Sequence, residues 1–227
     1  MSICKLEHIE KKYYNGETIQ PLKDINIEIN EHDFVVIEGP SGMGKSTLLY
    51  VIGTLLKSDS GSLTIDGVDT GSMSDVELTD LRAEKIGFLF QDSNMIQALT
   101  LRENLEFAEN IGKAGEGKSK EAGESRVDEL LEKFGLADRA NYLPHQLSGG
   151  QRRRAMAARA LINSPRLILA DEPTNDLDDK WAGTVIDMLK KECEKGSAVV
   201  MVTHNDKWTR GATVKYLLAD GTLVKTN

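Results

Sequence analysis

The stretch Gly39-Pro40-Ser41-Gly42-Met43-Gly44-Lys45-Ser46-Thr47 decides the fold of this 227-residue chain. It lies between an apolar run at residues 34–37 and a helical pattern at residues 45–56. The pattern G-x-x-x-x-G-K-[ST] between a buried strand and a helix is typical of a phosphate-binding loop, because backbone N–H groups and the positive end of the helix converge on one anion. The stretch predicts a triphosphate site, in which the Lys45 amine reaches the β- and γ-phosphates and the Ser46 hydroxyl binds Mg²⁺.

Outward from this loop, short apolar runs alternate with helical patterns. The runs are continuous and rich in β-branched residues, as strands covered on both faces are. They are residues 34–37, 86–90, 167–170 and 198–202, and helical patterns occupy residues 126–134, 152–162 and 181–194. We therefore expect an α/β fold with a mostly parallel core sheet. Period-two alternation at residues 25–29 and a strand-turn pattern at residues 63–67 predict an antiparallel β edge.

Residues 92–164 are helical by pattern and separate the second apolar strand from the third. We interpret them as a helical lobe inserted into a core lobe of residues 1–91 and 165–227, within one domain of residues 1–227. Inside this lobe, residues 112–125 are rich in Gly, Ser and charged side chains and predict a mobile surface loop.

The composition excludes several classes of protein. Lys and Arg number 28 against 36 Asp and Glu, so the net charge of −8 argues against bulk binding to a phosphate backbone. Cys4 and Cys193 are far apart and lack metal-ligand spacing, which predicts reduced thiols. The longest mainly apolar stretch, residues 48–56, is much shorter than the roughly 20 residues that a spanning helix needs.

Polar residues follow three of the predicted core strands. Gln91 follows the second run, Asp171 and Glu172 follow the third, and His204 comes just after the fourth. The carboxyl ends of parallel strands meet in one crevice, so we expect these side chains to converge on the phosphate loop. Asp171 would hold the Mg²⁺ hydration shell, and Glu172 would act as the general base or position the water that attacks the γ-phosphate. Taken alone, Asp171 or Thr174 would equally well cap the next helix.

The sequence Leu147-Ser148-Gly149-Gly150-Gln151 stands directly before a helix rich in Arg and Ala, where Ser148, Gly149 and Gly150 offer a second anion cradle at a helix N-terminus. It resembles the signature of the ABC ATPase family. The resemblance extends from Tyr13 to Gly221. It includes the phosphate loop, Gln91 as the Q-loop glutamine, the signature, residues 167–172 as Walker B, residues 175–178 as the D-loop, and His204 as the switch histidine.

This resemblance implies an ATPase that uses ATP and Mg²⁺ and works as a head-to-tail pair of identical copies. Each ATP would lie between the phosphate loop of one copy and the signature, residues 148–151, of the other. Asp178 resembles the aspartate that reaches across the pair, whereas Asn175 and Asp176 depart from the small residues common in the D-loop. The predicted catalytic residues are Lys45, Gln91, Glu172 and His204, and the predicted Mg²⁺ ligands are Ser46, Gln91 and Asp171.

Two features leave alternatives open. Tyr13 resembles the aromatic residue that stacks on adenine, and its spacing to Gly16 favours it over the neighbouring Tyr14. Arg152-Arg153-Arg154, just after the signature, is expected to be a solvated face with local ion pairs, in preference to a nucleic-acid site.

Around its motifs the chain most resembles the branch that serves lipoprotein release, macrolide efflux and antimicrobial-peptide resistance. That branch implies a subunit on the cytoplasmic face of a bacterial membrane that drives a separate permease, which would dock beside Gln91 and residues 92–101. No nucleic-acid partner is expected. The alternative is a soluble ABC ATPase that acts on nucleic acid or ribosomes, but such proteins usually carry two cassettes or a long coiled-coil insertion. A P-loop kinase or GTPase would leave residues 147–151 unexplained.

Overall fold

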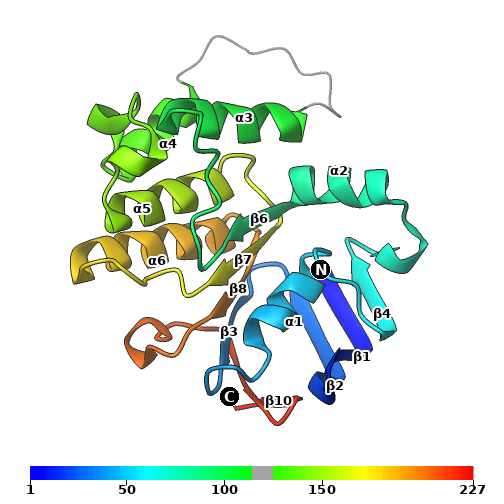
Figure 1. Ribbon diagram of the computed structural model, residues 1–227. Coiled ribbons are helices and arrows are strands. Elements are labelled where there is room, and N and C mark those ends of the chain that lie inside the picture. The colour runs from blue at the N-terminus through cyan, green and yellow to red at the C-terminus, as the bar shows by residue number, and fades with distance from the viewer. Residues whose placement is uncertain (114–124, 227) are drawn as a thin grey trace.

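The computed structural model describes residues 1–113 and 125–226. Its core is a six-stranded sheet, and Figure 1 shows this sheet with helices on both faces. In spatial order the strands are β10 (Thr222–Lys225), β9 (Val214–Ala219), β3 (Phe34–Glu38), β8 (Ala198–Val202), β7 (Leu167–Asp171) and β6 (Ile86–Leu89). All neighbouring pairs are parallel except β10 with β9. The predicted α/β fold with a mostly parallel core sheet is confirmed.

A second sheet is antiparallel and contains β2 (Glu17–Asn30), β1 (Ser2–Asn15), β4 (Ser60–Ile65) and β5 (Val68–Asp69), in that order. Ile25, Ile27 and Ile29 are buried and alternate with exposed residues, because successive side chains of a strand point to opposite faces. This sheet is the antiparallel edge that the sequence predicts.

Six α-helices are described. They are α1 (Lys45–Ile52), α2 (Asp75–Lys85), α3 (Leu101–Lys113), α4 (Arg126–Lys133), α5 (Gly149–Ala160) and α6 (Asp179–Glu194), and single 3-10 turns lie at Thr70–Ser72, Ala137–Arg139, Pro144–Gln146 and Asp206–Trp208. In residues 1–113 and 125–226, every helix is too short or too polar to cross a lipid bilayer. In Figure 1, α5 and α6 lie on one side of the core sheet, and α1 lies on the other with the antiparallel sheet.

Alternate residues of the core strands face two separate apolar clusters. Phe34, Val36 and Met201 face the first cluster, which also contains Leu130 and Phe134 from the helices. Val35, Ile37 and Val202 face the second cluster, which contains the apolar residues of α1 and of the antiparallel sheet. Each fully buried side chain of this size stabilises the fold by about 1.5–3 kcal/mol. The continuous apolar runs of the sequence therefore reflect strands that are covered on both faces.

Helices α3, α4 and α5 all lie between β6 and β7 in the chain, which is where the sequence places its inserted lobe. Their apolar residues belong to the same cluster as one face of the core sheet. The boundaries 92–164 stay a prediction. The loop expected at residues 112–125 lies largely outside the described residues.

Candidate nucleotide site

A cavity of about 400 Å³ opens at the carboxyl ends of β3, β7 and β8. The structure brings together there most of the residues that the sequence singles out. Its lining residues are Tyr13, Ile19, Pro21, Ser41, Gly42, Gly44, Lys45, Ser46, Thr47, Gln91, Asp171, Glu172, Asn175, Val202 and His204. The phosphate loop, the glutamine, the carboxylate pair and the histidine thus share one crevice, as expected for open parallel sheets. Among the described residues, Gly39, Pro40 and Met43 of the loop are outside this lining.

The phosphate loop depends on glycine where the chain turns most sharply. Gly44 precedes α1 with φ of 93°, and a Cβ atom there would lie 2.7 Å from the Pro21 Cβ. Gly39 has φ of 149°, and its Cβ would lie 2.3 Å from the Leu218 carbonyl oxygen. An L-residue would be both strained and obstructed at each position. The Lys45 amine donates to the carbonyls of Gly39 and Pro40, at 2.8 Å each, and so spans the loop from its interior.

Asp171 ends β7 and carries an incompletely satisfied carboxylate. The residue is 3% exposed, and its Oδ2 atom has no hydrogen-bond partner among the described residues. Burial raises the pKa of this carboxyl above its ordinary value, while a hydrogen bond with Ser46 and the charge of Lys45 act in the opposite direction. A free carboxylate oxygen beside a hydroxyl suits a hard cation such as Mg²⁺, which binds through one or two protein oxygens and keeps the remaining positions for water and phosphate. The residues present therefore fit this metal.

Glu172 has a strained backbone and two side-chain partners. Its φ is 48°, in the left-handed region that non-glycine residues rarely adopt, and such strain clusters at functional sites. Its carboxylate accepts a bond from the Thr203 hydroxyl at 3.1 Å and lies 2.7 Å from His204 Nδ1. The His204 side chain is 66% exposed and the Glu172 side chain 10%, so a largely exposed imidazole contacts a largely buried carboxylate.

The sequence patterns did not predict this Glu172–His204 contact, because they indicate the two side chains only as separate catalytic residues. Each residue follows a predicted core strand, but the sequence does not show that these two strands are neighbours. β7 and β8 are neighbours, with Asp171 in register with Val202, so the residues that follow are adjacent.

The structure distinguishes the two tyrosines. Tyr13 lines the cavity beside its cross-strand partner Ile19, whereas Tyr14 is 81% exposed and is not among the lining residues described. The Lys11 amine lies 5.8 Å from the centroid of the Tyr13 ring. Neighbours in a strand face opposite ways, so only one of the two can face the phosphate loop. Stacking of Tyr13 on adenine stays a prediction.

The signature forms the start of α5, outside the cavity. Ser148 caps the helix, with its hydroxyl accepting from the Gln151 N–H at 3.2 Å and its own N–H donating to the Gln151 side chain at 2.8 Å. Among the described residues, none of residues 148–151 lines the cavity. Asp178 likewise lies outside the lining and caps α6 by accepting from the Trp181 N–H at 2.9 Å. One chain therefore does not bring its two predicted anion cradles together.

The expectation of a solvated arginine face at residues 152–154 is wrong for two of the three. Arg153 and Arg154 are buried, at 5% and 8% exposure. A buried guanidinium needs hydrogen-bond acceptors, and backbone carbonyls from other segments supply them for both arginines. The Arg154 guanidinium donates to the carbonyls of Phe134 and Gly135 and lies 3.7 Å from the Trp181 ring.

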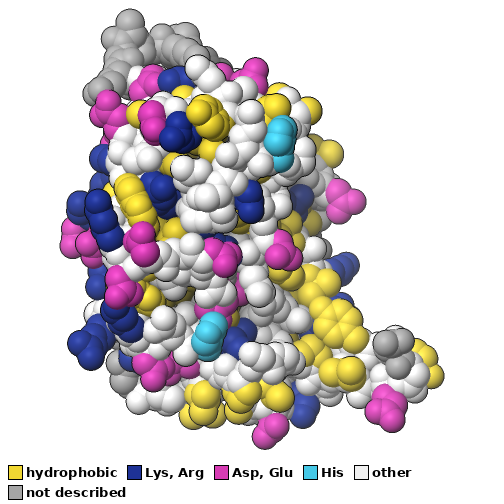
Figure 2. Space-filling model, turned by 60° about the vertical axis from the view of Figure 1, so that its left-hand side comes forward, with side chains coloured by type: hydrophobic (Ala, Val, Ile, Leu, Met, Phe, Trp, Pro, Cys, Tyr) yellow, Lys and Arg dark blue, Asp and Glu magenta, His cyan; other side chains and the backbone are white. Residues whose placement is uncertain are grey.

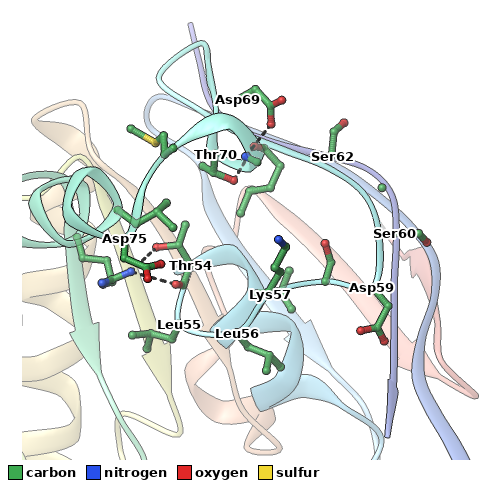
Figure 3. A pocket seen from close by; sticks show the side chains of 18 residues that line it. Thr54, Leu55, Leu56, Lys57, Asp59, Ser60, Ser62, Asp69, Thr70 and Asp75 are labelled. Atoms are coloured by element: carbon green, nitrogen blue, oxygen red, sulfur yellow. Dashed lines mark hydrogen bonds between the residues drawn. The ribbon is translucent and has the colours of Figure 1, made fainter.

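A larger cavity, of about 570 Å³, lies between the end of α1, β4 and α2 (Figure 3). It contains no residue of the phosphate loop. Here Arg82, one of the two cationic residues described in the lining of the cavity, donates to the Thr54 carbonyl at 3.1 Å and also to the Thr54 hydroxyl. Size alone therefore does not identify the nucleotide site, whereas the phosphate loop does.

Comparison with known proteins agrees with this geometry. The family model described as "ABC transporter" matches residues 22–175. An uncharacterized ABC transporter ATP-binding protein of Methanocaldococcus jannaschii, MJ0796, is 45% identical over 95% of this chain and 93% of its own. The macrolide export ATP-binding/permease protein MacB of Mannheimia succiniciproducens is 39% identical over 99% of this chain, which spans only 34% of MacB.

Solved structures give the same result. A dimeric structure of MJ0796 in a post-hydrolysis state, bound to ADP and Pi, superposes with a TM-score of 0.91 at 40% identity and covers 99% of both chains. A second dimeric structure of MJ0796 has a TM-score of 0.88.

Proposed function

Because this chain belongs to the ABC transporter family and is an ATP-binding, ATP-hydrolysing member of it, we propose that it drives a separate membrane permease of the export, efflux or lipoprotein-release type. The family uses ATP with Mg²⁺. The observation that carries the proposal is the convergence of the phosphate loop, Gln91, Asp171, Glu172 and His204 on one cavity. A kinase or GTPase would explain the phosphate loop but not the signature at residues 147–151.

The proposed chemistry assigns one task to each side chain. The loop N–H groups and Lys45 bind the β- and γ-phosphates, and the Tyr13 ring holds the base. Asp171 and Ser46, with Gln91, would hold Mg²⁺, which supplies positive charge to the phosphate oxygens when bound. Glu172 orients the attacking water and accepts its proton, with the carboxylate held in place by His204 at 2.7 Å.

A second copy of the chain is the proposed partner at the nucleotide. The signature lies outside the cavity of its own chain, so Ser148–Gln151 of one copy would complete the cavity of the other, and Asp178 would reach across. This arrangement closes as a twofold pair. The dimeric structures of the 40% identical MJ0796 support it.

A membrane permease is the proposed second partner, with the chain at the cytoplasmic face of the membrane. A groove of about 220 Å³ between α2, β6, α3 and α5 is lined largely by apolar residues, including Phe88, Phe90 and Ile111, and Phe107 on α3 is 48% exposed. Phe90 of this groove is followed by Gln91, which lines the nucleotide cavity, so we place the permease helix on the groove and on residues 92–101 beside Gln91. MacB, by its name, joins an ATP-binding part to a permease, which supports this pairing.

Nucleic acid remains the less favoured partner. Figure 2 shows Lys and Arg side chains interspersed with Asp and Glu on one face of the molecule, and the chain carries a net charge of −8. A phosphate backbone would be attracted by a continuous basic patch.

The decisive variant is Glu172→Gln, which keeps the shape of the side chain and removes the base. We expect ATP to bind, turnover to fall by about 10²–10⁴-fold, and dimers to form with MgATP on a sizing column. Glu132→Gln, on the exposed face of α4, is the matched control and should leave turnover unchanged. Wild-type turnover in Glu172→Gln would contradict the assigned role, and a monomer at every MgATP concentration would contradict the pair.

The permease is tested separately by purifying the tagged chain from detergent-solubilised membranes. An integral membrane protein should accompany it. Recovery with ribosomes or DNA instead would favour the alternative ATPase function.

A further inference from the structure

The buried guanidinium of Arg153 joins three segments that are far apart in the sequence. Arg153 lies on α5, two residues after the signature. Its Nη1 donates to the Phe90 carbonyl at 2.7 Å, and its Nη2 donates to the Gln91 carbonyl at 2.7 Å. Its Nε donates to the Asn175 carbonyl at 3.3 Å. The planar fork of the guanidinium thus spans the end of β6 and the segment after β7.

The side chain is held in place by its burial and its bonds. Arg153 is 5% exposed, and burial lowers the pKa of its guanidinium, while the charges of Asp176, Asp171, Asp92 and Glu172 oppose that shift. The nearest carboxylate oxygen, Asp176 Oδ2, lies 3.9 Å away. Arginine stays charged in such a setting, and charge-assisted hydrogen bonds are stronger than neutral ones.

The two segments that Arg153 holds each contribute a residue to the nucleotide cavity. Gln91 and Asn175 line the nucleotide cavity. Asp176, the next residue, has a left-handed φ of 62°, and its carbonyl oxygen would lie 3.1 Å from a Cβ atom placed on Gly150 of the signature. The segment after β7 therefore contributes Asn175 to the cavity wall and, at the next residue, lies beside the signature turn, although the signature itself lies outside the cavity.

We propose that Arg153 is a positioning residue that couples the nucleotide cavity to the signature of the same chain. It fixes the backbone at Gln91 and Asn175 relative to α5. When nucleotide binding sets the positions of Gln91 and Asn175, the signature at the start of α5 is therefore placed for contact with the second copy. The inference rests on the proposed function, in which the signature binds the nucleotide of the partner copy. Arg153 itself does not contact the nucleotide cavity among the described residues.

The chain offers a matched control in the next residue. Arg154 lies on the same helix, is also buried and donates to two carbonyls where Arg153 donates to three, but the two belong to Phe134 and Gly135, which are not among the lining residues of the cavity. Arg153→Gln and Arg154→Gln should both lower the melting temperature, because each leaves buried carbonyls without a donor. Only Arg153→Gln should change the nucleotide response.

The experiment compares these variants in three measurements. MgADP binding to the monomer should stay within about twofold of wild type in both, because the phosphate loop is intact. In Arg153→Gln, kcat should fall about 10- to 100-fold with little change in KM, since a small misplacement of a positioned group has effects of that size. In the Glu172→Gln background, the MgATP concentration for half-maximal dimerisation should rise about tenfold. Arg153→Lys keeps the charge but lacks the fork, so it should resemble Arg153→Gln.

Hydrogen exchange gives a readout of position that does not depend on activity. Peptides containing Gln91 and Asn175 should exchange faster in Arg153→Gln than in Arg154→Gln. Equal kcat, equal dimerisation and equal exchange in the two variants would overturn the inference and leave Arg153 a structural residue. Failure of the Glu172→Gln parent to dimerise would contradict the proposed function, and this inference with it, before any Arg153 variant is compared.

Discussion

Asp171 is a binding-site residue whose ionised carboxylate lowers the stability of the folded chain. Its carboxylate is buried, one oxygen lacks a partner among the described residues, and its pKa is raised chiefly by burial. A raised pKa in the folded state means that the ionised form is less favourable there than in the unfolded chain. A cation bound at the free oxygen would offset this cost in the working state.

Replacing this residue should therefore separate stability from function. Without nucleotide at pH 7, Asp171→Asn should unfold at a higher urea concentration than wild type, because the buried charge is gone. The difference should shrink as the pH falls toward the folded pKa of Asp171, where wild type also becomes neutral. The additional stabilisation by ATP that depends on Mg²⁺ should be lost. Asp138→Asn, whose side chain is 70% exposed, is the control. A lower urea midpoint in Asp171→Asn would contradict the reasoning.

At the same scale, the sequence indicates residue types better than residue contacts. Tyr13 could be preferred over Tyr14, and the lining positions of Lys45, Gln91 and Asp171 could be predicted, because motif and strand end place them. The bond between Glu172 and His204 depends on which strands are neighbours, and the order of strands is not written in local patterns. The burial of Arg153 depends on distant carbonyls in the same way.

The ends of the helices are set by capping residues, some of which can be recognised in the sequence. α1 ends at Ile52, four residues before its apolar pattern does, because Gly53 caps it and Thr54 adopts a left-handed φ of 57°. α5 begins at Gly149, before the expected residue 152, because Ser148 and Gln151 form a capping box. That S-x-x-Q pattern was available in the sequence as a start signal.

Two hairpin turns differ in how closely neighbouring backbone packs against their glycine. The Asp66-Gly67 turn joins β4 to β5, and Asp220-Gly221 joins β9 to β10, with positive φ at all four residues. A Cβ atom at Gly67 meets no described atom within 4 Å, whereas one at Gly221 lies 2.9 Å from the Gln20 carbonyl oxygen. Gly67→Ala should cost about 1–2 kcal/mol, from backbone conformation alone. Gly221→Ala should cost more, and urea unfolding measures both. Equal losses would show that the contact with Gln20 adds nothing.

The two faces of the core sheet belong to two apolar clusters, and each cluster contains one cysteine. Cys193 lies in the cluster with the helices, and Cys4 lies in the cluster with the antiparallel sheet. Burial raises the pKa of each thiol to about 12. Neither thiolate therefore forms at neutral pH in the folded chain.

The two thiols consequently report on cooperativity. Because both clusters rest on the same strands, we expect neither to open alone. Pulse labelling with a thiol reagent in increasing urea, followed by mass spectrometry, should modify Cys4 and Cys193 with the same midpoint. The reagent should label both rapidly in the fully unfolded chain, as the positive control. Earlier labelling of either thiol would mean that one face of the sheet opens independently.

Because the signature lies outside its own chain's cavity, the proposed function makes ATP hydrolysis depend on assembly. Under the proposed function, a single copy saturated with ATP would not hydrolyse it, because the signature that completes its cavity comes only from a second copy. At low protein concentration the chain would then hydrolyse little ATP. Tethering two copies side by side raises their effective concentration without any new contact. A permease that binds two copies would thus switch on ATP hydrolysis by holding them next to each other.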